Sequence, residues 1–227
     1  MDAEISYIIP ILNIGGYEMV TSKNKESYKA LKEKLFIRIE PESLEAKSVP
    51  HEKREDLYLT AHILQAYEAG EIDSYRVTYS LLKDIGIAEE EMFRDAMINS
   101  EKILPMSTAW LSSLLFGGDT EEMNDLNRPH MLVVSNEKGI YGSSALFYQD
   151  TLKKLFILFR QGFYILPASI HELILLPEKE ASDYQELENM VKDINMTKVA
   201  EEDFLSDNVY YYSSNLDTII KASDHCN

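Results

Sequence analysis

The chain has 227 residues, of which 45% are hydrophobic and 27% are charged, and its formal net charge is −17. This composition is that of an ordinary globular protein with room for a sizeable core. The acidic balance argues against nucleic-acid binding, because that affinity comes from Lys and Arg side chains that displace counterions from phosphates. The acidic surplus is either a solubility feature or a surface for a basic protein partner.

The single cysteine, Cys226, is the penultimate residue. One thiol cannot form an intramolecular disulfide, which favours a reducing compartment and therefore the cytoplasm. The first residues of the chain are acidic rather than basic, and Pro10 interrupts a short apolar run. We therefore expect neither a signal peptide nor a membrane span at this end.

The first 24 residues predict a weakly structured or strand-like segment. A short helix over 26–35, an apolar strand over 35–39 and a charged connection over 40–55 follow. Residues 56–64 alternate as in a strand, although the stretch that begins at Ala61 is also compatible with a helix.

A helical hairpin is predicted at about residues 74–99. Ser74 is a candidate N-cap, and apolar residues recur after it at steps of four. Gly86 stands where a left-handed cap residue belongs. Three glutamates, Glu89 to Glu91, then mark the start of the second helix, where negative charge suits the helix dipole.

Residues 117–129 give the strongest loop signal, and an internal boundary or mobile lid is predicted there if the chain has one. A strand at 131–134, a helix near Ser143 and a helix capped by Asp150 come next. A hairpin of strands 163–166 and 170–176, a helix that opens at Ser182, a strand at 209–212 and a helix around 216–222 complete the chain. Without regular βαβ alternation, this order predicts a single α+β domain over 1–227, with a mainly antiparallel sheet flanked by helices.

His171 and Glu172 are the first candidates for catalytic residues, because they form a His-Glu pair within an apolar run. In a regular strand their side chains point to opposite faces, so they act as a dyad only if a bulge after Pro167 re-aims one of them. The helical zinc pattern needs a second histidine where this chain has Leu175. A carboxylate buried in such a strand needs a partner, so Glu172 is predicted to have one.

Ser143 and Ser144 follow Gly142 at a predicted helix start, where backbone N–H groups can bind an anion. A serine nucleophile also needs a base and an oxyanion hole, and the surrounding residues do not form the usual nucleophile elbow. Helix capping by Ser143 is the alternative.

His51, Asp56 and His62 include plausible metal-ligand types, but their scattered positions give a weak signal. No phosphate-binding loop, dinucleotide fingerprint or cysteine-based zinc spacing occurs. We therefore expect no metal and no cofactor.

Three consecutive tyrosines, Tyr210, Tyr211 and Tyr212, are candidates for an interaction surface. Tyrosine combines apolar contact area with a hydrogen-bonding hydroxyl, which suits protein interfaces. One interpretation packs one face of this strand in the core and leaves Tyr211 exposed or covered by a partner. The other buries both faces.

Several segments resemble an uncharacterised bacterial family, a domain of unknown function frequent in Gram-positive anaerobes of the gut. They are VPHEKREDLYLTA (Val49–Ala61), MLVVSN with the following GIYG (Met131–Gly142), FYILPASIHELILLP (Phe163–Pro177), MVKDIN (Met190–Asn195) and FLSDNVYYY (Phe204–Tyr212). The likeness covers about residues 35–212. It implies a cytoplasmic protein and brings no activity, cofactor or catalytic residue. Its members commonly have a longer, strand-rich N-terminal region, which leaves open whether this chain has an uncovered sheet edge near the start.

The leading hypothesis is a non-enzymatic cytoplasmic interaction or regulatory protein. It would bind a protein partner through the tyrosine-bearing sheet edge or the acidic surface, without contact to a membrane or nucleic acid. The alternative is a small hydrolase that uses His171 and Glu172 beside the helix start at Ser143 and Ser144. A concave pocket where these four side chains converge would favour the enzyme. The sequence leaves the oligomeric state and the identity of the partner open.

Overall fold

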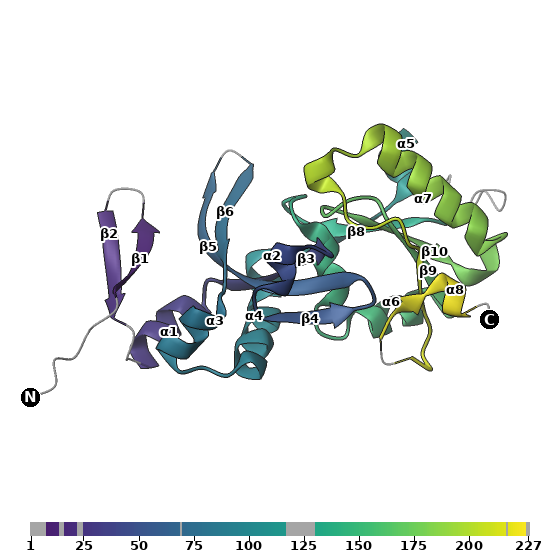
Figure 1. The fold of residues 1–227 in the computed structure, drawn as a ribbon. Helices are drawn as coiled ribbons and strands as arrows, with labels where there is room; N and C mark the ends of the chain where they lie inside the picture. The colour runs from purple at the N-terminus through teal and green to yellow at the C-terminus, as the bar shows by residue number, and fades with distance from the viewer. Residues whose placement is uncertain are drawn as a thin grey trace, which may run out of the picture.

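The computed structural model describes residues 8–13, 16–21, 25–68, 70–116, 130–216 and 218–225. In this part of the chain the strands form three sheets, and every strand pair is antiparallel (Figure 1). Helices flank the two larger sheets, so the α+β prediction is confirmed. The smallest sheet is a hairpin of β1 (Ile8–Asn13) and β2 (Gly16–Thr21).

The second sheet has four strands in the order β3-β5-β4, and β6 also pairs with β5. Its members are β3 (Leu35–Pro41), β4 (His51–Arg54), β5 (Leu57–Glu68) and β6 (Glu71–Arg76). The strand interpretation of residues 56–64 is thus confirmed over the helical one. The predicted connection over 40–55 also contains a short helix, α2 (Leu44–Lys47), and β4.

Helices α1 (Lys25–Lys32), α3 (Tyr79–Ile85) and α4 (Glu89–Ile103) cover the apolar face of this sheet. The helical hairpin is confirmed, and Gly86 has the left-handed conformation that its position predicts, with φ +69°. The predicted N-cap is wrong: the Thr78 side chain accepts a hydrogen bond from Leu81 N. Ser74 lies in β6 instead, because pairing with β5 keeps the chain extended as far as Arg76.

The third sheet has six strands in the order β12-β11-β9-β10-β8-β7. They are β7 (Met106–Trp110), β8 (Leu132–Asn136), β9 (Phe163–Pro167), β10 (Leu173–Pro177), β11 (Tyr210–Tyr212) and β12 (Ile220–Lys221). The predicted helix around 216–222 is wrong, because Ile220 and Lys221 pair with β11 and the helix begins only at Ala222. The predicted loop 117–129 and Cys226 lie outside the described residues.

Helices of different lengths connect these strands or follow the last of them. They are α5 (Leu111–Phe116), η2 (Gly142–Phe147), α6 (Thr151–Phe159), η3 (Glu178–Glu180), α7 (Tyr184–Lys198), η4 (Glu201–Asp203) and α8 (Ala222–His225). The side chain that caps α7 is Asp183, which accepts from Gln185 N, rather than the predicted Ser182.

The two faces of the six-stranded sheet pack against different layers. On one face, Ile165 and Tyr210 join a buried cluster that continues through η2 into the apolar face of the four-stranded sheet. On the other face, Leu166 and Tyr211 pack beneath Leu187 and Val191 of α7, the long helix that crosses this sheet in Figure 1. The larger cluster therefore connects both sheets through one continuous core.

Candidate functional site

His171 and Glu172 lie in the turn between β9 and β10, before the second strand begins at Leu173. Both Ala168 N and Ser169 N donate to Glu172 O, at 3.2 and 3.1 Å, which folds the chain back on itself. The prediction of an extended strand from residue 170 is therefore wrong for residues 170–172. The Glu172 side chain is exposed, so the predicted buried carboxylate is also wrong.

The imidazole of His171 is held at both ring nitrogens. Tyr141 N donates to His171 Nδ1 at 3.1 Å, and His171 Nε2 lies 2.9 Å from an Asp203 carboxylate oxygen. A backbone N–H can only donate, so Nδ1 is an acceptor and the ring proton is on Nε2, toward Asp203. No lone pair remains to take a proton from a serine hydroxyl.

Ser143 and Ser144 lie near His171, but their hydroxyls form hydrogen bonds with the backbone. Ser143 Oγ donates to Ser169 O at 2.8 Å. Ser144 Oγ donates to Tyr141 O and accepts from Ile39 N, both at 3.0 Å. Both residues are 0% exposed. A nucleophile needs access to substrate and a base within hydrogen-bond reach, whereas these serines join η2 to β3 and to the turn before β10.

The three tyrosines of β11 are buried on both faces of the sheet, which is the second of the two interpretations. Tyr211 is 3% exposed, and its hydroxyl donates to a Glu178 carboxylate oxygen at 2.9 Å. The Tyr210 hydroxyl donates to Asp56, and burial is the main cause that raises the pKa of Tyr210. Because β12 pairs with β11, this strand is not the edge of the described sheet.

The three scattered candidates for metal ligands have separate roles. Asp56 accepts hydrogen bonds from the 206–210 segment, and the His51 ring packs against Tyr58. His62 bonds to Glu40. Within the described ranges, no group of three His, Cys, Asp or Glu side chains is placed to hold a metal ion.

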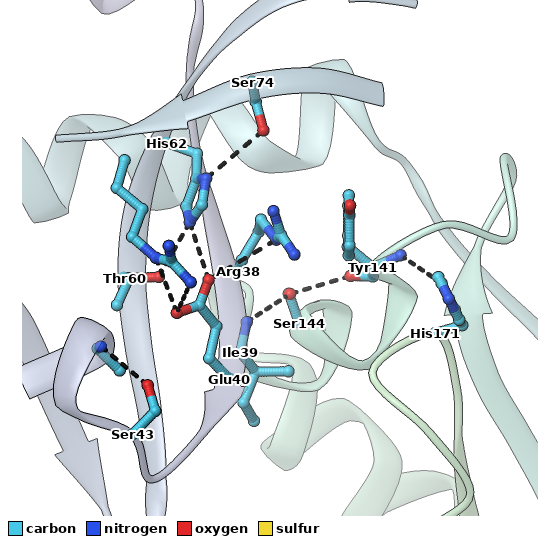
Figure 2. Close-up of polar contacts among 12 residues, drawn as sticks. Arg38, Ile39, Glu40, Ser43, Thr60, His62, Ser74, Tyr141, Ser144 and His171 are labelled. Carbon is cyan, nitrogen blue, oxygen red and sulfur yellow. Dashed lines mark hydrogen bonds and ion pairs between the residues drawn. The ribbon is translucent and has the colours of Figure 1, made fainter. Parts of the chain in front are cut away.

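A polar cluster that the sequence reasoning missed lies on the second face of the four-stranded sheet (Figure 2). The Arg38 cluster, as we call it, consists of Arg38, Glu40, Thr60, His62, Ser74 and Arg76. Glu40 Oε1 lies 3.1 Å from His62 Nε2, and Glu40 Oε2 accepts from Arg76 Nε at 3.1 Å. The alternation of Phe36, Arg38 and Glu40 in β3 was the available signal, because it places all three on one face.

Electrostatics keep Glu40 charged and His62 neutral. Burial alone would raise the pKa of Glu40, but the His62 hydrogen bond and the nearby arginines outweigh it and lower the pKa to about 2. Burial lowers the pKa of His62 to about 4, against the opposing hydrogen bond to Glu40. At neutral pH the Arg38 cluster therefore holds one carboxylate, two guanidinium groups and an uncharged imidazole.

The depressed pKa of His62 predicts an acid-sensitive free energy of unfolding. The unfolded chain takes up this proton near pH 6.5, whereas the folded chain does so near pH 4, so stability falls as the pH drops through this window. The expected loss is on the order of 3 kcal/mol. Urea denaturation between pH 7 and pH 4 measures it, and His62→Gln should flatten the curve. Equal pH slopes for both proteins would refute the assignment.

The exposed side of α7 carries an apolar stripe with acidic neighbours. Met190 and Ile194 are 37% and 40% exposed, and they are one turn apart on the same side of the helix. Glu186 and Asp193 lie beside them, and all four line one shallow depression along the helix. We call these four residues the α7 stripe. Leu187 and Val191, on the adjoining face of the helix, pack it against the sheet.

No helix in the described part of the chain is both long enough and apolar enough to cross a bilayer.

Comparison with known proteins places the chain in a family. Searches of curated proteins and of solved structures gave no match. A family model described as "Family of unknown function (DUF5688)" matches residues 13–214. This match spans most of the 227 residues and includes every segment of the Arg38 cluster and the α7 stripe. The chain therefore belongs to the DUF5688 family.

Proposed function

We propose that the protein is a non-enzymatic interaction module of the bacterial cytoplasm that binds a basic, amphipathic helix of a protein partner. The observation that carries this proposal is the α7 stripe, in which exposed Met190 and Ile194 adjoin Glu186 and Asp193. The single cysteine and the family resemblance support the cytoplasmic location. The core shared by both sheets supports a single domain.

Charge complementarity selects the partner. The chain has 39 acidic and 22 basic residues, and acidic side chains also outnumber lysines along α7 and the η4 turn that follows it. A basic partner is drawn toward such a surface, and an acidic protein or nucleic acid is repelled. The apolar part of the α7 stripe runs along the helix axis, which suits a partner helix whose own apolar residues recur at i, i+3, i+4 and i+7.

The hydrolase alternative has less support. The His171 ring has both nitrogens engaged, and the Ser143 and Ser144 hydroxyls are buried in backbone hydrogen bonds. Glu172 is exposed on the turn. The contacts of His171, Ser143 and Ser144 support a structural role in joining η2, the turn and η4, so surface recognition is the better-supported function.

A defined peptide tests the proposal. The probe is a fluorescent helical peptide of leucine and lysine with leucines at i, i+3, i+4 and i+7, and its partner probe has glutamate in place of lysine. The full chain should bind the lysine peptide with a dissociation constant below about 100 μM and the glutamate peptide much more weakly. The double variant Met190→Ser/Ile194→Ser should weaken binding at least about tenfold.

Matched variants distinguish specific binding at the α7 stripe from nonspecific hydrophobic binding elsewhere on the surface. Ile157→Ser/Leu158→Ser removes exposed apolar area from α6 and should leave binding unchanged. Asp193→Lys should weaken binding more than Glu90→Lys, an exposed charge reversal on α4. Equal binding of both peptides, or equal losses in the α6 and α7 double variants, would overturn the proposal.

A further inference from the structure

The Arg38 cluster carries more positive than negative charge. Glu40 Oε1 is paired with His62, and Glu40 Oε2 accepts from Arg76 Nε, with Arg76 Nη2 also 3.1 Å away. Arg38 Nε is 4.0 Å from Glu40 Oε1, beyond hydrogen-bond distance. One carboxylate therefore serves two guanidinium groups. A partly buried excess cation is unfavourable unless an anion neutralises it. This local excess of positive charge contrasts with the chain as a whole, whose formal net charge is −17.

The guanidinium of Arg38 is oriented by Tyr141, and its Nε lacks a hydrogen-bond partner among the described residues. Its carbon lies 3.4 Å from the centre of the Tyr141 ring, so one face of the plane is covered. Its Nε is buried and makes no hydrogen bond within the described residues. The side chains of Arg38 and Arg76 are 17% and 38% exposed, so both remain accessible from solvent. A buried donor left unpaired costs free energy.

The loop that carries Tyr141 is braced in a strained conformation. Tyr141 has a φ of +54°, in the left-handed region that non-glycine residues rarely occupy. His171 accepts from its N–H, Ser144 donates to its carbonyl, and the His171 ring stacks on the far side at 5.7 Å. Figure 2 shows Tyr141 between Arg38 and His171. Strain of this kind persists where surrounding contacts enforce it, and here its result is a fixed guanidinium plane.

We propose that Arg38 and Arg76 form a binding site for an oxyanion, namely the phosphate or carboxylate group of a small-molecule ligand. The planar guanidinium of Arg38 carries N–H donors in a fork whose geometry matches two oxygens of such a group. Arg76 supplies the second charge from β6, which pairs with β5 rather than with β3, while Glu40 holds it in place. This site lies on the four-stranded sheet and is independent of the α7 stripe.

Inorganic phosphate and acetate, at constant ionic strength, are the probes. Binding to the full chain is followed by the thermal midpoint and by ³¹P line broadening for phosphate. We expect one of the two anions to bind saturably with a dissociation constant of about 1 mM or below. The anion that binds more tightly identifies the ligand group. Arg38→Met should weaken binding at least about tenfold, and Arg38→Lys should weaken it less, because lysine keeps the charge but loses the planar fork. Arg94→Met, on the exposed side of α4, should have no effect.

Chemical modification of the unaltered protein keeps the test valid even if Arg38→Met folds poorly. Phenylglyoxal labels arginines, and peptide mapping should show that the tighter anion protects Arg38 and Arg76 but not Arg94. Absence of saturation by either anion would overturn the proposal. So would equal stabilisation of wild type and folded Arg38→Met, or uniform protection of all three arginines.

Discussion

Glu40→Gln is expected to lower the free energy of unfolding by about 3 kcal/mol at pH 7, because it removes the only carboxylate of the Arg38 cluster. The amide has nearly the same shape, so the loss reflects charge rather than packing. Arg38, Arg76 and His62 would then share a buried environment without a counter-charge. The partial exposure of Arg76 keeps the expected loss at the lower end of the range for broken buried pairs.

Chemical denaturation of two further variants checks the origin of this loss. Glu42→Gln alters an exposed glutamate just beyond β3 and should change stability far less than Glu40→Gln does. In the double variant Glu40→Gln/Arg76→Gln the loss should be smaller than the sum of the two single losses, because the cation disappears with its partner. Additive losses, or a Glu40→Gln loss no larger than that of Glu42→Gln, would show that the pair is not coupled.

Asp56→Ala is the second large effect, with an expected loss of about 3 kcal/mol. Asp56 lies in the turn between β4 and β5 and accepts from Ser206 Oγ, Asn208 Nδ2 and the Tyr210 hydroxyl, each at 2.9 Å. These bonds fix the chain that enters β11 to the four-stranded sheet. Burial would raise the pKa of Asp56, but the three hydrogen bonds and Lys221 outweigh it and lower the pKa.

Urea denaturation again gives the measurement, and Asp207→Ala is the matched control. Asp207 accepts from Asn195 on the surface of the same segment, so its loss should stay below about 1 kcal/mol. Asp56→Asn should fall between wild type and Asp56→Ala, since the amide keeps one acceptor oxygen. If Asp56→Ala loses no more than Asp207→Ala, the two sheets do not depend on this carboxylate.

Local sequence patterns correctly predicted the helices and strands whose conformation depends mainly on their own residues. Gly86 ends α3 because only a residue tolerant of positive φ fits there, and the apolar runs around 132 and 163 become central strands. The N-cap of α3 was misplaced because the signal at Ser74 is overridden by strand pairing between β5 and β6. Such pairing depends on residues that are distant in sequence or weakly patterned, and single-sequence propensity does not contain it.

For the candidate site too, the sequence indicates some features and only the fold supplies the others. His171 was a candidate catalytic residue because of its side-chain chemistry. Its hydrogen bonds, however, are made with Asp203 and with the N–H of Tyr141, each about 30 residues away. Arg38 and Glu40 were visible as polar positions in an alternating strand, but their partners come from β5, β6 and the loop before η2. Only the fold brings these segments together, so sequence alone indicates the residue types and not the cluster.

Methionine-methyl NMR of the full chain, titrated with the leucine–lysine peptide, is the most direct test of the proposed partner surface. We expect the Met190 methyl resonance to shift saturably, with the dissociation constant found by anisotropy. Met92 in the core and Met196, which is exposed on another side of α7, should stay unchanged. An unmoved Met190 resonance, or an equal shift of Met196, would mean that the protein does not recognise a basic helix through the α7 stripe.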